Sequence, residues 1–483
     1  MDTFPYCKTI RRYFSGAAAL LLLPLLFCVS NPTEPEECTS GDCGETPTGG
    51  PGDWTPTLPA CAGAGADGLD KSRPDLGLDS AIVIAYDGDS AEIVSNTYIN
   101  INYGNMLDVK IDGGHVVIKG DVDPKNAFRV NIVLSGSTGN GSFKVDASNL
   151  NKNLGLYMNG VNITNPTGPA VNIQKTGKID TVLVHLVGCE KNFLADGVKY
   201  DAPQGDEQAK GTFFSEGAVA IVGGGSLEIR SKGKSADGLK NLHAMVIDNH
   251  FVMKSGNIII HESVNDGIHV NRNISITNGT LQIKSTGDAI QNEKNFPVNI
   301  TGGKLTLWTT GEKSHGIACD SNDVKIGGSA DIDIKITVLG KGAKGIRSRR
   351  NVEISGGTIN ISTYGGISVT PSDDDDDNTD NTSSAAGVRA ASINTATSNG
   401  KFSMTAGTLT IRSTGDNSKG INADGGVTVG GGKINIKAIG DGIKTDGEVK
   451  VTGGEIYTES AKKKAIDCTK ESIEGGTVVK LPK

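Results

Sequence analysis

The stretch that decides the fold is residues 256–290, which read GNIIIHESVNDGIHVNRNISITNGTLQIKSTGDAI. One pattern occurs twice in it: a glycine, an alternation of apolar and polar residues, and then an aspartate followed by a small residue and an isoleucine. Such alternation over four to eight positions predicts a β-strand with one buried face. The stretch therefore predicts short strands that begin at glycine and are separated by tight corners.

The same pattern recurs between Ser226 and Thr477. Successive copies lie 22 to 29 residues apart, except for one interval of 75 that is close to three periods. A period of this length, built from strands without a helical pattern, predicts a parallel β-helix. Glycine-led strands begin at Gly256, Gly279, Gly303, Gly407 and Gly432, and the corner motif begins at Asp237, Asp266, Asp288, His315, Lys344, Lys419, Asp441 and Lys464.

Composition agrees with one long all-β domain. The 483 residues include 66 glycines and only 16 prolines without a Gly-x-y period, which excludes collagen and argues against disorder. The net charge of −8 and the absence of a basic cluster exclude a nucleic-acid partner. A stack of repeats has no fixed size, so one domain can account for most of this length.

The N-terminus predicts export. Residues 1–28 carry Arg11 and Arg12 ahead of an apolar run that is too short for a membrane span. The run ends in a sequence that resembles a bacterial lipobox, which predicts a lipid on Cys28, although Phe27 is bulky for such a signal. Bacterial outer-membrane or cell-surface attachment is thus expected, with simple secretion and an uncleaved anchor as alternatives.

The remainder divides by composition. Residues 29–80 are rich in Pro, Thr and Gly and predict a tether. The β-domain is expected over 81–483, with irregular early rungs and a cap in 81–220 and regular repeats in 221–483. Residues 371–400 interrupt the period with a run of five aspartates, which predicts an inserted acidic loop that is either solvated or able to collect calcium.

Residues that recur once per turn form columns, because stacked strands lie about 4.8 Å apart. The first column precedes the Gly/Ala-Ile pair and contains three successive carboxylates, which repel one another unless they are hydrated, protonated or bridged by a cation. Calcium prefers such oxygen ligands. The alternative is that Asp-Gly is ordinary turn chemistry. The calcium candidates in this column and the next corner are Asp237, Asp266, Asp288, Asp441, Asn271, Glu293 and Asp320.

The second column follows the last inward aliphatic residue of each strand and is expected to point outward. It is mostly basic, and its tryptophan could stack on a sugar, so it predicts a surface for a carboxylated polysaccharide. The alternative is a set of ordinary solvent-facing strand residues. The carbohydrate-binding candidates are Trp308, Arg230, His261, Lys284, Lys335, Arg412 and Lys437.

Catalysis has little support in the sequence. It contains no Ser/His/Asp constellation and no marked glycosidase pair of acids. A calcium-dependent uronate lyase would need a lysine or arginine as its base. Lys344, Arg347 and Lys240 are the candidates for that alternative.

The stretch from Ala81 to Thr477 resembles a family of exported bacterial β-helix proteins described as calcium-bearing carbohydrate-binding domains. The residues that carry this resemblance are 189–197 (CEKNFLADG), 217–229, 236–239 and 265–268. It implies a right-handed parallel β-helix of the pectate-lyase-like kind, bound calcium, and binding of plant cell-wall polysaccharide without established lyase activity. It also implies calcium at Asp237, Asp266, Asp288 and Asp441, and puts it in doubt where His315, Lys344, Lys419 and Lys464 replace the aspartate.

Three functions thus remain open. The leading hypothesis is an exported surface protein that binds pectic or cellulose-like polysaccharide with calcium as its cofactor. The second is a calcium-dependent pectate-type lyase. The third is a structural stalk or adhesin whose repeats only set its length.

Overall fold

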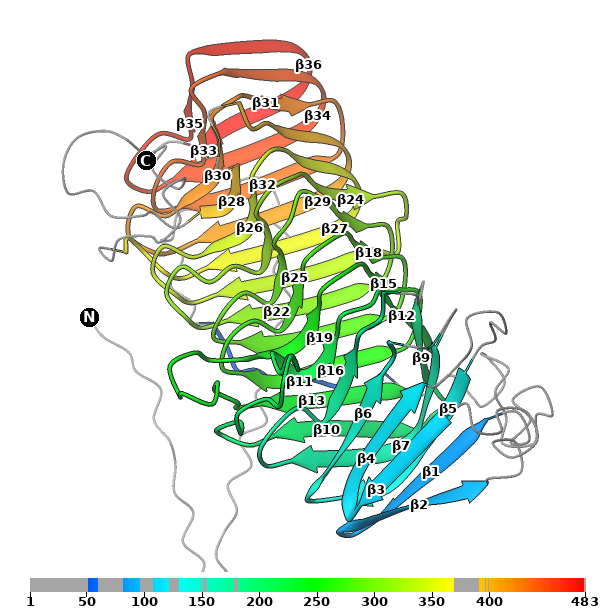
Figure 1. Cartoon of the computed structure of the whole chain (residues 1–483). Coiled ribbons are helices and arrows are strands. Elements are labelled where there is room, and N and C mark those ends of the chain that lie inside the picture. Colours follow the sequence, from blue (N-terminus) through cyan, green and yellow to red (C-terminus); the bar gives the residue numbers. More distant parts are fainter. Residues whose placement is uncertain are drawn as a thin grey trace, which may run out of the picture. The chain divides into compact units, whose positions relative to one another are not determined.

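Every described element of the chain is a β-strand, and the strands form two large sheets (Figure 1). All the described residues belong to one unit, Thr46–Lys483. The predicted all-β class is confirmed for this part of the chain. The computed structural model describes residues 51–59, 81–95, 107–120, 130–148, 150, 154–177, 181–368, 391–395, 397 and 399–481.

The two sheets have 22 and 14 strands. The larger sheet consists of β1 (Ile82–Asp87), β2 (Ser90–Ser95), β5 (Val130–Thr138), β7 (Leu154–Asn165), β9 (Val182–Leu186), β10 (Lys191–Asp196), β12 (Val219–Gly223), β13 (Ser226–Ser231), β15 (Phe251–Met253), β16 (Asn257–Ser263), β18 (Ile274–Ile276), β19 (Thr280–Ser285), β21 (Val298–Ile300), β22 (Lys304–Thr309), β24 (Val324–Gly327), β25 (Asp333–Val338), β27 (Val352–Thr363), β29 (Phe402–Ser413), β31 (Val427–Val429), β32 (Lys433–Ala438), β34 (Glu448–Ser460) and β36 (Lys470–Leu481). The smaller sheet consists of β3 (Leu107–Asp112), β4 (Gly114–Gly120), β6 (Gly141–Asp146), β8 (Val171–Gln174), β11 (Gly211–Ser215), β14 (His243–Ile247), β17 (Ile268–Val270), β20 (Ile290–Asn292), β23 (Ile317–Cys319), β26 (Lys344–Ser348), β28 (Ala391–Thr395), β30 (Lys419–Ala423), β33 (Ile443–Lys444) and β35 (Ile466–Asp467).

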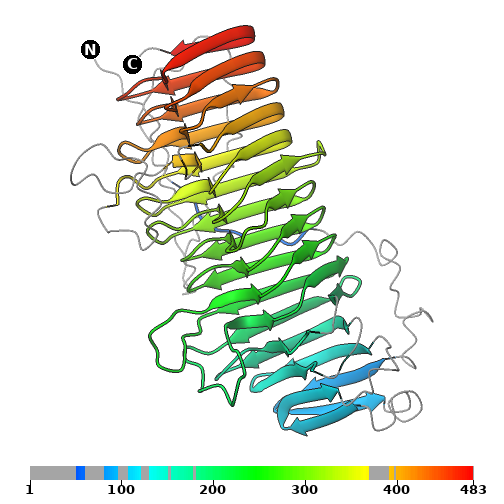
Figure 2. The same ribbon diagram turned by 45° about the horizontal axis from the view of Figure 1, so that its top comes forward.

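The chain winds in successive turns that stack on one another (Figure 2). In the regular part, each turn contributes one strand to the smaller sheet and two short strands, or one long strand, to the larger sheet. Strands β17, β18 and β19 of one turn pair in parallel with β20, β21 and β22 of the next. The sequence period is therefore the length of one turn, as predicted.

Inward-facing aliphatic side chains form continuous ladders between the sheets. One ladder runs from Ile258 through Leu281, Leu305 and Ile334 to Ile359, and each of these residues is at most 1% exposed. Burying such a side chain stabilises the fold by about 1.5–3 kcal/mol. Since each rung covers its neighbour, the core extends along the stack.

The small residue ahead of each corner isoleucine is required by close packing. A Cβ atom on Gly316 would lie 2.3 Å from Cγ2 of Ile336 and 2.6 Å from the carbonyl oxygen of Gly345. The first atom belongs to the opposite strand of the same turn, and the second to the next turn. The repeated Gly/Ala-Ile signature thus marks the place where the two sheets come closest together.

The N-terminal end of the stack differs from the rest. Strands β1 and β2 form an antiparallel hairpin, and so do β3 and β4. Each hairpin then continues into a parallel sheet through β5 and β6. The irregular early region predicted for 81–220 thus includes a pair of hairpins at the edges of the two sheets, where unpaired strand groups would otherwise begin.

The motif at 189–197 has a structural role. Asn192 is 1% exposed, and its side chain bonds the amide of Val161 and the carbonyl of Ser226. The Asp196 carboxylate accepts hydrogen bonds from Tyr200, Thr212, Ser231 and the amide of Lys232. These contacts tie together three consecutive turns just before the regular repeats, so they account for the motif without a sugar ligand.

Several predicted features lie outside the described residues. They are the export signal 1–28 with Cys28, most of the tether 29–80, and most of the acidic insertion 371–400. Within the predicted tether, residues 51–59 are described, and we call them the strap. The Thr57 backbone exchanges two hydrogen bonds with the Gln282 side chain, of 3.0 and 2.6 Å. The strap therefore lies against the outer face of the larger sheet.

Candidate functional site

A column of polar residues runs along one corner of the stack. Its members lie two positions before the buried residues that pair from strand to strand in the smaller sheet, from Met245 on β14 to Ile466 on β35. The register places Ala391 at this position of β28, between Lys344 and Lys419, so the polar column is interrupted there. We call it the corner column, and it contains His243, Asp266, Asp288, His315, Lys344, Lys419, Asp441 and Lys464.

Four side chains of this column, Asp266, Asp288, His315 and Asp441, each accept a hydrogen bond from a backbone amide of the following turn. Asp266 Oδ1 accepts a hydrogen bond of 2.8 Å from the amide of Asp288. The same contact repeats for Asp288 with His315 N (2.5 Å), His315 Nδ1 with Lys344 N (3.1 Å) and Asp441 Oδ1 with Lys464 N (3.1 Å). An unsatisfied buried amide costs about 1–3 kcal/mol, so this ladder explains why the corner keeps acceptors.

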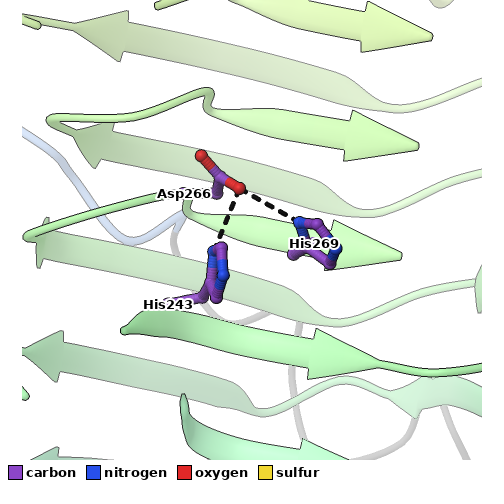
Figure 3. A group of neighbouring side chains, drawn as sticks. All are labelled: His243, Asp266 and His269. Carbon is purple, nitrogen blue, oxygen red and sulfur yellow. Dashed lines mark hydrogen bonds and ion pairs between the residues drawn. The ribbon is translucent and has the colours of Figure 1, made fainter. Parts of the chain in front are cut away.

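Two histidines lie on either side of Asp266 (Figure 3). Asp266 Oδ2 is 3.0 Å from His243 Nδ1 on β14 and 3.1 Å from His269 Nδ1 on β17. Burial alone would raise the pKa of Asp266, but hydrogen bonds and charges of the two imidazoles hold it well below its usual range. Burial alone would lower the pKa of His269, whereas Asp266 raises it to about 9. Without a bound cation, the group is a buried ion pair.

The next carboxylate in the column has the opposite electrostatic environment. Burial raises the pKa of Asp288 well above its usual range, and the charges of Asp266 and Asp320 add to this effect. The positive charge of Arg347, which forms an ion pair with Asp320, partly opposes this rise in the pKa of Asp288. The surroundings of Asp288 therefore disfavour its negative charge.

Asp237 does not belong to the corner column, so the prediction that it begins this column is wrong. It lies on an exposed excursion, residues 232–242, that is closed by the Lys234–Asn241 bridge. Its Oδ1 accepts hydrogen bonds from the Ser235 hydroxyl and the Leu239 amide, so it is a turn former. His243, the residue in register with Asp266, takes its place in the column.

The remaining calcium candidates divide into two groups. Asp266, Asp288, Asn271, Glu293 and Asp320 lie on three consecutive turns around β17, β20 and β23. Asp441 precedes β33, which pairs with β30 and β35 much further along the stack. The structure thus places five of the seven candidates at the two ends of these neighbouring strands and leaves Asp237 and Asp441 elsewhere.

Sequence reasoning missed His243 and His269. Four of the seven histidines of the chain lie between positions 243 and 269, and that density was the available signal. The register that places His243 beside Asp266 could not be read from the sequence, because the excursion 232–242 contains a false copy of the corner motif.

On the outer face of the larger sheet, polar side chains form two stripes. The Lys284 stripe contains Lys284, Trp308, Thr337, Ser362, Arg412, Lys437 and Glu459. The neighbouring Gln282 stripe contains Gln282, Thr306, Lys335, Asn360, Thr410, Asn435 and Tyr457.

The register corrects one member of the predicted basic column and adds an aromatic residue. Lys335 pairs with Thr306, whereas Trp308 pairs with Thr337, so Lys335 belongs to the Gln282 stripe. The sequence reasoning also overlooked Tyr457, which occupies an outward position in the same stripe and has the Lys433 ammonium 5.4 Å from its ring centre.

Other predicted members of the basic column have partners within the protein. Arg230 is exposed and lies over the Phe193 ring at 5.9 Å. His261 Nε2 is 2.6 Å from Glu228 Oε2, next to a bulge between β13 and β16. Lys437 Nζ is 3.7 Å from Glu459 Oε2, and Lys284 and Arg412 are half-buried.

Trp308 is not an exposed sugar platform, contrary to the sequence prediction. It is 9% exposed. Trp54 of the strap lies against it with ring centres 6.3 Å apart and the ring planes tilted by 59°. A segment about 250 positions earlier in the sequence thus covers the indole.

The residues named for a lyase mechanism are in unsuitable places. Lys344 and Arg347 are each 2% exposed, and Arg347 is paired with Asp320. Lys240 is exposed, but it lies on the 232–242 excursion, away from β26, which carries both Lys344 and Arg347. A base that removes a proton from a polymer needs contact with it, and burial denies that contact to Lys344 and Arg347.

Two further findings concern the cysteines and the search for membrane-spanning helices. Cys189 is disulfide-bonded, whereas Cys319 and Cys468 are free. The described residues include no helix long and apolar enough to cross a membrane.

Comparison with known proteins identifies a family model. The model of a carbohydrate-binding domain-containing protein matches residues 128–413 and 402–481, which together are more than half of the chain. No curated protein matches the sequence. A solved structure of a polysaccharide lyase-like protein from C. thermocellum, a gadolinium derivative, has 18% identity and a TM-score of 0.38 over 59% of this chain and 92% of its own. That structural likeness is too weak to support a conclusion about fold or activity.

Proposed function

Because the chain belongs to the carbohydrate-binding domain-containing protein family, we propose that it is an exported surface protein that binds plant cell-wall polysaccharide without cleaving it. Family membership is the observation that carries this proposal. The fold in this proposal is a right-handed parallel β-helix of the pectate-lyase-like kind. Turn-by-turn parallel pairing of strands supports that interpretation.

The binding face in this proposal is the part of the two outer stripes that the strap leaves open. It extends over β25, β27, β29, β32 and β34, where the stripe residues other than the buried Thr337 are half-buried or exposed. Five turns at about 4.8 Å per turn make a track roughly 20 Å long, enough for about two disaccharide units. Its donors and acceptors include Lys335, Asn360, Thr410, Arg412, Asn435, Lys437 and Tyr457.

Pectic chains such as polygalacturonate are the favoured ligand. Lys335 and Arg412 present positive charge on a protein of net charge −8, and Lys437 lies in the turn after Arg412. Tyr457 supplies an aromatic face on which a sugar ring can stack. A cellulose-like chain would use the amides and the tyrosine but would gain little from the cations.

Calcium is proposed as a cofactor at the corner, beside Asp288 and Asp320. The fit rests on Asp288, a 9% exposed carboxylate whose pKa is raised by burial and by the charges of Asp266 and Asp320, so a cation there would offset the repulsion. Glu293, which follows β20 on the same turn, could add a ligand. Asp266 fits less well, because both of its oxygens already have partners and imidazoles lie beside it.

Export completes the proposal. Residues 1–28 have the composition of an export signal, and a lipid on Cys28 would hold the domain at the outer membrane or cell surface of a bacterium. The disulfide at Cys189 supports an oxidising compartment. Secretion without a lipid would serve the same binding function.

The test measures retention of the full chain on polygalacturonate and on cellulose, with calcium and with a chelator, together with ultraviolet-absorbing unsaturated products. We expect saturable retention on polygalacturonate without product. The double variant Arg412→Ala/Lys437→Ala should weaken it by several-fold to about tenfold, and added salt should weaken it as well. The matched control is Lys119→Ala/Lys254→Ala, which removes two exposed lysines outside both stripes.

The other outcomes identify the alternatives. Product that forms only with calcium would make the protein a lyase. Salt-insensitive retention on cellulose alone would replace the pectic ligand with a neutral one. If neither polymer retains the protein, the binding function fails and a structural stalk is favoured.

A further inference from the structure

Three donor atoms lie within 4.8 Å of one another on the corner, and a fourth lies beside one of them. They are Nδ1 of His243, Oδ2 of Asp266, Nδ1 of His269 and Oε1 of Gln291. The measured separations are 3.0 Å from His243 to Asp266, 3.1 Å from His269 to Asp266, and 2.8 Å from His269 to Gln291. We propose that these side chains bind one borderline first-row divalent cation, such as Zn²⁺.

The spacing of the donors fits tetrahedral coordination. Zinc binds imidazole nitrogen and carboxylate oxygen at about 2.0–2.1 Å, which places neighbouring ligands of a tetrahedron about 3.3 Å apart. Each measured separation is a few tenths of an ångström shorter. A cation could therefore enter with small outward movements of the side chains.

His243 supplies a second, independent observation. Its Nδ1 is buried, and it faces Asp266 Oδ2 at 3.0 Å, the same oxygen that His269 Nδ1 approaches. The two imidazole rings are also close, with centres 4.6 Å apart. Two imidazole nitrogens that share one carboxylate oxygen form an arrangement that a shared metal ion would satisfy.

Neighbouring residues hold the ligands in orientation, as protein metal sites require. The Asp288 amide donates to Asp266 Oδ1 and leaves Oδ2 for the site. Gln291 Nε2 donates to Asp320 Oδ2 at 2.8 Å, so its Oε1 faces His269. On the far side of the His269 ring, Nε2 lies 3.5 Å from Glu293 Oε2.

The donor set selects against calcium. Calcium takes six to eight oxygen ligands, whereas this group offers two nitrogens and two oxygens. Imidazole suits zinc, copper and nickel, and affinity generally rises towards the end of the first transition series. Asp266, which sequence reasoning assigned to calcium, is thus reassigned to a different class of cation.

The position of the site suggests what the metal would do. His243 belongs to β14, Asp266 and His269 lie at β17, and Gln291 lies on β20. A cation would therefore join three consecutive turns immediately after the 232–242 excursion. It would act as a structural clamp at the start of the regular repeats.

The test uses the full chain, stripped with chelator and then dialysed against Zn²⁺ or Co²⁺ in the presence of excess calcium. We expect one Zn²⁺ retained per chain, a visible Co²⁺ absorption typical of tetrahedral coordination, and a melting temperature that rises with Zn²⁺ concentration. Excess calcium keeps hard-cation sites occupied, and glycan binding is not measured, so this result is independent of the proposed function.

Variants assign the ligands. His243→Ala and His269→Ala should abolish Zn²⁺ retention, and Asp266→Asn should do so while it keeps an acceptor for the Asp288 amide. Glu293→Gln should weaken Zn²⁺ binding by about 10- to 100-fold. His115→Gln, a half-buried histidine bonded to Ser142 on another part of the smaller sheet, is the matched control.

Two results would overturn the proposal. One is a folded wild-type chain that retains no Zn²⁺ and gives no Co²⁺ absorption. The other is Zn²⁺ retention that persists unchanged in folded Asp266→Asn and His269→Ala variants. If His243→Ala does not fold, the wild-type Co²⁺ absorption and the Asp266→Asn variant still decide the question.

Discussion

The corner column and the Lys284 stripe both repeat one residue per turn, yet their residues have different surroundings. In the corner column, Asp288 is 9% exposed and bonded to the backbone of the next turn. In the stripe, Arg412 and Lys437 are half-buried side chains on the outer surface. A repeated position in the corner is therefore constrained by its neighbours. In the part of the stripe that the strap leaves open, a repeated position other than the buried Thr337 remains available to a ligand.

The largest effect is expected where the corner has no spare volume. The Cβ atom of Gly316→Val would lie only 2.3 Å from Cγ2 of Ile336 and 2.6 Å from the carbonyl oxygen of Gly345. The two methyl groups of valine would add to this crowding. Overpacking of this kind costs about 1–3 kcal/mol, and we expect the upper end of that range. Denaturant unfolding would measure it.

The comparison gives this experiment its controls. Gly316→Ala should be milder than valine, because Ala289 occupies the same position one turn earlier. Gly139→Ala, where an added carbon would have no neighbour within 4 Å, should change stability little. Equal losses at Gly316 and Gly139 would contradict the view that the corner is tightly packed.

A second substitution tests whether the corner carboxylates act as backbone acceptors. Asp288→Ala leaves the buried His315 amide without its partner and should cost about 1–3 kcal/mol in the presence of chelator. Asp288→Asn keeps an acceptor for the His315 amide. It also removes a carboxyl group whose pKa is raised by burial, so this substitution should leave the free energy of unfolding unchanged or increase it. Unfolding free energies of the two variants provide the measurement.

Thr410→Ala in the Gln282 stripe is the control for this pair. It is an outward, half-buried side chain and should change stability by less than about 0.5 kcal/mol. Should the asparagine variant lose as much stability as the alanine variant, the charge of Asp288 rather than its hydrogen bond would be what the corner needs.

The repeat predicted the all-β class and the parallel strands, because the physical cause is local. Alternation of Ile with polar residues, together with small residues ahead of Ile, determines which side chains enter the core. Strands β16, β19, β22, β29 and β32 lie where the glycine-led copies were found. The antiparallel hairpins at the N-terminal end were not predicted, because pairing direction there depends on which strands meet at an edge.

The site was harder to predict, because it depends on register. Asp237-Gly-Leu239 matches the corner motif, yet the chain makes an exposed excursion there and resumes the column at His243. Likewise, the alternation along β25 does not show whether Lys335 or Thr337 lies beside Trp308. The pairing of Lys335 with Thr306 assigns Lys335 to the Gln282 stripe.

Trp308 shows a third reason, a contact between distant parts of the chain. Residues 51–59 have the composition of a tether, and nothing in them indicates that they lie on β19 and β22. The strap therefore covers the outer face of the larger sheet at β19 and β22, and it leaves the outer face from β25 onward open.

The smallest expected effect concerns this covered part. Trp54→Ala removes one aromatic pair and should cost about 0.5–1.5 kcal/mol or less, while it uncovers Trp308 and lengthens the open track. Because Trp54 and Trp308 are the two tryptophans of the chain, Trp54→Phe makes Trp308 the sole indole fluorophore. If polysaccharide displaces the strap, Trp308 emission should shift when polymer is added to Trp54→Phe, and Trp54→Ala should bind polymer more tightly than the wild type. Unchanged emission with unchanged affinity would mean that the strap is a permanent part of the sheet surface, and the binding track would then begin at β25.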